Sequence, residues 1–296
     1  MKKTGAILIF VLALSITVGV LEARQQPAAD SPAPPLWAFP VAPAAPRGAG
    51  GGGRGAAAPA DTSPKSVPNS SVTLTLQQVR DAYNVPDWHP DGHPVMPEIV
   101  KNGRRPTVFG CGYCHLPNGQ GRPENSSMAG LPAEYIVQQM ADFKNGLRKS
   151  SESRLGPQNL MVNIGKAATG DEVKAAAEYF SKLKPKPWIR VIETANVPKT
   201  RIAGGMFIAL EGTETEPIGN RIIEVPENLE HVELRDDGTG FIAYALVGSI
   251  KKGQLLVTSG GGRTTACAVC HGSDMRGIGP VPSIAGRSPS QMARQI

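Results

Sequence analysis

Two segments of the chain carry apolar residues at the spacing of an amphipathic helix. In residues 132–146, Ile136, Met140 and Phe143 fall on one helical face between an opening proline and a closing glycine. In residues 169–183, an apolar stripe follows the sequence Thr-Gly-Asp-Glu, which is a capping box. Each segment is therefore predicted to be a helix.

The region of residues 189–247 has the pattern of strands instead. Residues 221–225 alternate weakly between apolar and polar side chains. Residues 231–235 and 241–247 flank the sequence Asp-Asp-Gly-Thr-Gly (236–240), which is typical of a hairpin turn. The pattern predicts a small β element.

The first 70 residues lack the pattern of a folded domain. Two lysines, an apolar run over residues 5–21 and a small residue at Ala23 predict that residues 1–23 are a secretory signal peptide. An uncleaved membrane anchor is the alternative, although the run is at the short end for spanning a bilayer. Residues 24–70 are rich in proline, alanine and glycine and are predicted to be a disordered linker. The rest of the chain is expected to be exported to the periplasm.

The sequence Cys-x-x-Cys-His occurs twice and uses all four cysteines of the chain. The residues are Cys111, Cys114 and His115 in the first copy, and Cys267, Cys270 and His271 in the second. This motif is the covalent attachment site of c-type haem, in which each thiol adds to a vinyl group and the histidine binds the iron. We therefore predict two covalently attached haem c groups, with His115 and His271 as axial ligands.

Other interpretations of these residues fit less well. A redox dithiol leaves both histidines unexplained, and a four-thiolate zinc site usually has its cysteine pairs closer together. A disulfide is possible in an exported protein, but across two intervening residues it closes a strained ring. The formal charge of +6 does not indicate a nucleic-acid partner, because each haem brings two propionates that leave the mature protein near neutral.

A gapless repeat relates the two motifs at an offset of 156 residues, the separation of Cys111 and Cys267. Positions outside the motif also match: Gly121 with Gly277, Ala129-Gly130 with Ala285-Gly286, and Gln139 with Gln295. Such matches indicate two copies of one module rather than two chance motifs. We assign the first module to residues 71–188 and the second to residues 248–296.

Met161 is the candidate for the second axial ligand of the first haem iron. A thioether opposite the histidine is common in electron-transfer haems, and it raises the potential. Met128 is the competing candidate, but the repeat matches it with Ile284, which cannot bind iron. Met140 lies on a predicted helix face and is more simply a core residue. A first site without a methionine ligand also stays open.

The second copy has no counterpart of Met161, because the offset places that counterpart at position 317 and the sequence ends at Ile296. Met275 is too close to His271 for the opposite face of a haem, and Met292 matches a helix-core position. The second module is therefore expected to be truncated and the sequence to be a fragment. A five-coordinate second haem, open to small ligands, is the alternative.

These residues resemble the tandem dihaem class I cytochromes c, a family of periplasmic electron carriers. The resemblance rests on both haem motifs, on the sequence of residues 135–148, and on the position of Met161 eight residues before Thr169. It covers roughly residues 105–184 and 248–296.

The resemblance implies a mostly α fold: two class I cytochrome c modules joined by a small β-containing connection (residues 189–247), with the second module incomplete. It implies an electron carrier without catalytic residues, with other redox proteins as transient partners. A cytochrome subunit of a dehydrogenase or oxidase complex, with a possible membrane association, is an alternative. A haem enzyme with an open second site is another. The connection is expected to hold the modules relative to each other, or alternatively to dock a redox partner.

The stretch before the first motif departs from the family pattern. Its prolines forbid a long helix, so the leading helix is predicted to be short, near residues 97–102, or displaced to residues 75–83. Residues 249–257 predict the leading helix of the second copy. His89 and His93 could bind a metal at their spacing, but histidines among prolines and glycine are more simply loop residues.

Overall fold

The computed structural model describes residues 35–42 and 62–296, so the predicted signal peptide and most of the predicted linker lie outside the described residues. The helices are α1 (Leu76–Val79), α2 (Glu98–Lys101), α3 (Cys111–His115), α4 (Ala133–Lys144), α5 (Gly156–Ala167), α6 (Gly170–Lys182), α7 (Leu229–Glu233), α8 (Ser249–Ser259), α9 (Ala268–His271) and α10 (Pro289–Ala293). Three short 3-10 turns are η1 (Leu36–Ala38), η2 (Pro90–Gly92) and η3 (Gly260–Gly262).

The strands form four small sheets. They are β1 (Pro64–Lys65), β2 (Leu74–Thr75), β3 (Ile189–Glu193), β4 (Asn196–Pro198), β5 (Thr200–Ala203), β6 (Met206–Ala209), β7 (Thr215–Pro217), β8 (Ile223–Pro226) and β9 (Phe241–Ala245). The three-stranded sheet has the order β3-β9-β8, and the pairs β1-β2, β4-β7 and β5-β6 are antiparallel. The strands make the fold mixed α/β, which corrects the expected mostly α class.

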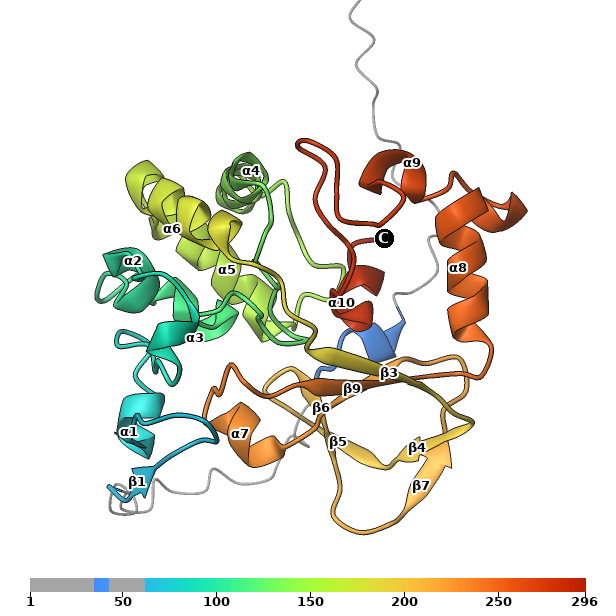
Figure 1. Cartoon of the computed structure of the whole chain (residues 1–296), viewed down its shortest axis with the longest axis horizontal. Coiled ribbons are helices and arrows are strands. Elements are labelled where there is room, and N and C mark those ends of the chain that lie inside the picture. The colour runs from blue at the N-terminus through green and yellow to red at the C-terminus, as the bar shows by residue number, and fades with distance from the viewer. Residues whose placement is uncertain (1–34, 43–61) are drawn as a thin grey trace, which may run out of the picture. The chain divides into compact units, whose positions relative to one another are not determined.

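The first copy is built around α4, α5 and α6, which lie side by side (Figure 1). The two helices predicted from the apolar stripes are confirmed as α4 and α6. Ile136 of α4 packs in one core cluster with Ala177 and Phe180 of α6, and all three side chains are buried. The capping box is also present, since Thr169 and Glu172 each accept a hydrogen bond from the other's backbone N–H.

The leading helices follow the predictions. The first copy has the short helix α2 near residues 97–102, and α1 lies within the upstream alternative at residues 75–83. The second copy has α8 where residues 249–257 predicted a helix. The segment that holds Met161 is also helical, as α5, which the sequence analysis did not predict.

The predicted hairpin at residues 231–247 is wrong. Residues 229–233 form the helix α7, because the side chain of Asn228 accepts a hydrogen bond from the backbone N–H of His231 and caps it. Strand β9 is present but runs parallel to β3 and antiparallel to β8. The Asp-Asp-Gly-Thr-Gly turn therefore joins a helix to a strand.

The connection contacts both copies, as expected of an element that holds them relative to each other. On one side, Gln120 of the first copy donates to the backbone oxygen of Thr239 at 2.8 Å. On the other, the buried carboxylate of Glu224 on β8 accepts hydrogen bonds from Ser288 Oγ at 2.7 Å and from the backbone N–H of Ser290 at 3.0 Å. Glu224 thus fixes the start of α10 to the sheet.

Among the described residues, no helix has the length and apolar character needed to cross a membrane.

Burial of Glu224 predicts a pH-dependent stability. Burial raises the pKa of this carboxyl above its ordinary value of 4.5, and the hydrogen bonds from Ser290 and Ser288 only partly oppose it. The folded protein therefore binds this proton more tightly than the unfolded chain does. Binding of this proton stabilises the folded protein fully below pH 4.5, and this contribution is lost as the pH rises through the raised pKa of Glu224.

Replacing Glu224 by glutamine keeps an accepting oxygen and removes the charge. We expect the free energy of unfolding of E224Q to exceed that of the wild type by on the order of 1 kcal/mol at pH 8, and by less at pH 5. Urea unfolding at the two pH values measures this. E214Q, at an exposed position paired with Lys199, is the control. A difference for E224Q that does not change with pH would contradict the prediction.

Candidate functional site

The first motif forms the one-and-a-half-turn helix α3, which places its side chains toward a cavity. Cys111 and Cys114 are half-buried, and His115 is only 8% exposed. The loop that follows returns to the motif, because the backbone N–H of Gly121 donates to the carbonyl of His115 at 2.9 Å.

His115 is held by its Nδ1 atom, which lies 2.7 Å from the backbone oxygen of Ser126. A carbonyl oxygen can only accept, so Nδ1 carries the proton and Nε2 has a free lone pair. Burial lowers the pKa of His115, although the hydrogen bond to Ser126 opposes this shift. The imidazole is therefore neutral at pH 7, with Nε2 ready to bind a metal ion. A hydrogen bond of this kind commonly orients metal-binding histidines.

The second motif repeats this arrangement at the same offset. His271 Nδ1 lies 2.8 Å from the backbone oxygen of Pro282, which is the counterpart of Ser126. The backbone N–H of Gly277 donates to the carbonyl of His271 at 2.8 Å. The two loops share further backbone bonds, and α4 and α10 begin at matching positions. The second site is the more open one, because Cys270 is exposed and His271 is half-buried.

The four cysteines form no disulfide with one another. Burial raises the pKa of Cys111 to about 12, with a smaller contribution from Cys114. Burial also raises the pKa of Cys114, partly offset by nearby Arg235. Both thiols are therefore protonated at pH 7.

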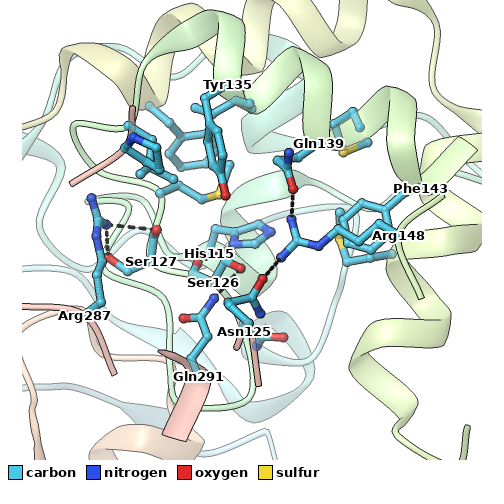
Figure 2. Close-up of a pocket in the computed structure, with 18 of the residues that line it drawn as sticks. His115, Asn125, Ser126, Ser127, Tyr135, Gln139, Phe143, Arg148, Arg287 and Gln291 are labelled. Carbon is cyan, nitrogen blue, oxygen red and sulfur yellow. Dashed lines mark hydrogen bonds between the residues drawn. The ribbon is translucent and has the colours of Figure 1, made fainter. Parts of the chain in front are cut away.

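The residues of both motifs line one cavity of about 650 Å³. The predicted site residues that it brings together are Cys111, Cys114, His115, Met161, Cys267, Cys270 and His271. Figure 2 shows His115 between Tyr135 and Gln139 of α4 on one side and Gln291 of α10 on the other. The cavity volume is in the range of pockets that hold cofactor-sized ligands. A planar, largely apolar group with two vinyl substituents fits this donor set and space.

Three methionines of the first copy line this cavity, and their packing differs. Met128 and Met140 pack against the main core cluster, which explains their burial without any ligand. Met161 reaches the cavity from α5, and it is absent from that cluster. Of the three methionines, Met161 is therefore the one whose position at the cavity is not explained by packing in the core cluster. Its role as an iron ligand stays a prediction.

Arg287 joins the two copies at the edge of the cavity, and sequence reasoning missed it. Its guanidinium donates to the backbone oxygens of Ser127 and Ala129 at 2.9 and 3.0 Å, and to Ser127 Oγ at 2.8 Å. Burial lowers its pKa to about 10. The repeat gave no signal, because Arg287 stands where the first copy has Leu131.

A second arginine bridges equivalent residues of the two copies. Arg148 donates to Gln139 Oε1 at 2.5 Å and to Gln295 Oε1 at 2.7 Å, and these glutamines match in the repeat. Burial lowers the pKa of Arg148. Two half-buried cations thus lie at the cavity, where they suit a ligand with negative groups.

Known proteins match parts of the chain. It is 36% identical over 77 residues to the thiosulfate dehydrogenase electron acceptor of Stutzerimonas stutzeri, covering 26% of this chain and 33% of that protein. It is 30% identical over 97 residues to the cytochrome subunit of sulfide dehydrogenase of Chlorobaculum tepidum, covering 33% of this chain and 81% of that protein. The chain spans about a third of the length of the thiosulfate dehydrogenase electron acceptors that it matches. No family model matches the chain.

Solved structures give weaker matches. A thiosulfate dehydrogenase of Marichromatium purpuratum aligns with a TM-score of 0.38 at 18% identity, covering 65% of this chain and 29% of the other. Cytochrome c4 of Acidithiobacillus ferrooxidans aligns with a TM-score of 0.38 at 21% identity, covering 62% of this chain and 77% of the other.

Because Arg287 makes several hydrogen bonds between the copies, we expect its replacement to destabilise the protein. Arg287→Ala leaves two backbone carbonyls and one hydroxyl without their donor, so the free energy of unfolding should fall by about 3 kcal/mol. Arg287→Lys cannot reproduce the planar fork and should recover less than half of this loss. Chemical denaturation measures both.

The matched control is Arg276→Ala in the same copy. Its side chain is 73% exposed and forms a surface ion pair with Asp274, so its loss should change stability by less than about 0.5 kcal/mol. Equal effects at the two positions would show that Arg287 does not join the copies in solution.

Proposed function

We propose that this chain, which belongs to the family of c-type cytochromes, carries two covalently attached haems and passes single electrons between redox proteins. The observation that carries the proposal is the pairing of two Cys-x-x-Cys-His motifs around one cavity. Both motifs hold their histidine by the same Nδ1 bond to a backbone carbonyl. Covalent haem supplies an iron centre that changes by one electron.

The first site has a complete set of candidate residues. Cys111 and Cys114 would form the two thioether links, and His115 Nε2 would bind the iron on one face. Met161 is our choice for the other face, because it lines the cavity apart from the core cluster. The half-buried guanidinium of Arg148 would balance negative propionate charge.

The second site uses the same chemistry in a more open setting. Cys267 and Cys270 would hold the second haem, and His271 is the axial ligand that we assign to it. Since Cys270 is exposed and His271 is half-buried, solvent reaches this site more easily than the first. Exposure and burial tune haem potentials, so the two sites should differ in potential.

Electron transfer at these sites should not be tied to proton transfer through the histidines. The Nδ1–H groups of His115 and His271 donate to backbone carbonyls, which cannot take up a proton at ordinary pH. These acceptors therefore offer no site to which either ring could pass its proton. This suits a carrier that meets its partners briefly.

We propose a dehydrogenase as the electron donor. One relative is named an electron acceptor of thiosulfate dehydrogenase, and another a cytochrome subunit of sulfide dehydrogenase. Both names associate the relative with a dehydrogenase. We place this chain in the same role, without catalytic residues of its own, and expect it to be exported to the periplasm with its N-terminal signal.

Haem counting tests the two sites separately. The wild-type protein should carry two haems, whereas C111A/C114A and C267A/C270A should each carry one, and the quadruple variant none. Intact mass and haem staining on a denaturing gel measure this, because only covalent haem survives denaturation. A wild-type protein with one haem would overturn the pairing, and one without covalent haem would overturn the proposal.

Replacement of Met161 tests the sixth ligand. Met161→Ala should lower the potential of one haem by a substantial part of the ~0.8 V range that axial ligands span, and should alter its oxidised absorption spectrum. Met128→Ala and Met140→Ala are matched controls, because both line the same cavity. Spectroelectrochemical titration gives the potentials. If Met128→Ala alone lowers a potential, Met128 is the ligand instead.

A further inference from the structure

Three side chains that the haem sites do not use meet between the first copy and the connection. They are His89, in the stretch before the first motif, and the adjacent Asp236 and Asp237, in the turn between α7 and β9. His89 Nε2 lies 3.1 Å from Asp236 Oδ1 and 3.7 Å from Asp237 Oδ1. Ligand atoms of the three lie within 4.8 Å of one another.

The two carboxylates are buried side by side. Both oxygens of Asp236 have partners, among them the backbone N–H of Gly238, which donates to Oδ1 at 2.7 Å. The side chains of Asp236 and Asp237 are 3% and 4% exposed. Asp237 Oδ1 is buried and has no hydrogen-bond partner. The nearby Arg235 does not supply the missing charge, because its guanidinium lies over the ring of Tyr113, 3.4 Å from the ring centre. Adjacent buried carboxylates are unfavourable unless positive charge compensates them.

The two distances from His89 are close to those between ligands of one small cation. Zinc binds imidazole nitrogen and carboxylate oxygen at about 2.0–2.2 Å, so two ligands of a tetrahedral ion lie roughly 3.3–3.6 Å apart. The two His89 distances, 3.1 and 3.7 Å, lie on either side of this range. A nitrogen ligand disfavours calcium and magnesium, which prefer oxygen.

We propose that His89 Nε2, Asp236 Oδ1 and Asp237 Oδ1 bind one divalent transition-metal ion of the zinc class. The ion neutralises the two buried carboxylates and gives Asp237 Oδ1 the partner that it lacks. The site joins the connection to the first copy. The two parts also meet nearby, where Trp88 Nε1 donates to the backbone oxygen of Leu234 at 2.7 Å. Its role is structural and independent of the haem sites.

The surrounding histidines complete this arrangement. His231 Nδ1 lies 3.2 Å from Asp236 Oδ2, where it orients the carboxylate while Oδ1 faces His89. His93 does not join His89, contrary to the spacing in the sequence, and pairs with Asp87 at 3.0 Å. With His115 and His271 in the haem motifs, these residues account for all five histidines of the chain.

Zinc binding by the holoprotein tests the proposal. After chelator washing, equilibrium dialysis against micromolar zinc chloride should give one zinc per chain. The haem iron of the same sample gives the amount of chain. Zinc X-ray absorption should show only nitrogen and oxygen ligands, near 2.0–2.2 Å. Sulfur near 2.3 Å would place the zinc on cysteines and overturn the assignment. Failure to bind zinc would leave His89 as a charged partner of the aspartates and would also overturn it.

Variants locate the ion without touching the haem motifs. Asp237→Asn should weaken zinc binding by roughly 100-fold or more, and His231→Gln by a smaller factor of about 10 to 100. Gly238→Ala keeps every ligand, but a Cβ there would lie 3.0 Å from Asp236 Oδ1 and 3.1 Å from His89 Nε2. It should therefore also weaken binding.

Asp91→Asn is the matched control, because Asp91 is exposed in the same stretch as His89. It should bind zinc like the wild type. The haem absorption spectrum and far-ultraviolet circular dichroism show whether each variant is folded. Unchanged zinc affinity in folded Asp237→Asn and Gly238→Ala would rule out this site.

Discussion

The hydrogen bond from each motif histidine to a backbone carbonyl eleven residues later is the constraint on which both sites depend. It fixes the ring, the tautomer and the path of the loop between the two residues. Gly121 and Gly277 make this path possible, since both have positive φ, and a Cβ at Gly121 would lie 2.5 Å from the carbonyl oxygen of Ser126. The glycine at position 121 thus has a physical reason, because a side chain there would collide with the carbonyl that accepts the hydrogen bond of His115.

Local patterns in the sequence predicted the parts of the first copy that depend on neighbouring residues. The stripes of α4 and α6, the capping box at Thr169 and the short α2 are all present. Helix α5 was missed because its burial comes from packing on α4 and from the cavity, and neither shows as a periodic stripe with a cap. The structure repeats at the same offset as the sequence, since the acceptors of His115 and His271 are also 156 residues apart.

The connection could not be predicted in the same way, because long-range contacts decide it. Residues 231–235 alternate like a strand, yet the Asn228 cap makes them helical, and β9 finds its partners in β3 and β8. The same turn then meets a histidine 147 positions earlier in the chain, from Asp236 back to His89. The sequence offered His93 as a companion of His89 only as an alternative to two loop histidines, whereas the fold brings two aspartates to His89.

One loop, residues 126–129, both holds the histidine of the first site and contacts the second copy. Ser126 accepts the Nδ1–H of His115 through its carbonyl, while its hydroxyl accepts from Gln291 Nε2 at 2.6 Å. The next residues of this loop, at positions 127 and 129, accept from Arg287. The second copy therefore stiffens the loop that orients the first copy's ligand. Because the orientation and hydrogen bonding of an axial histidine tune its iron, docking of the second copy should influence the electronic properties of the first site. We infer that the two copies act as one redox unit rather than as two independent carriers.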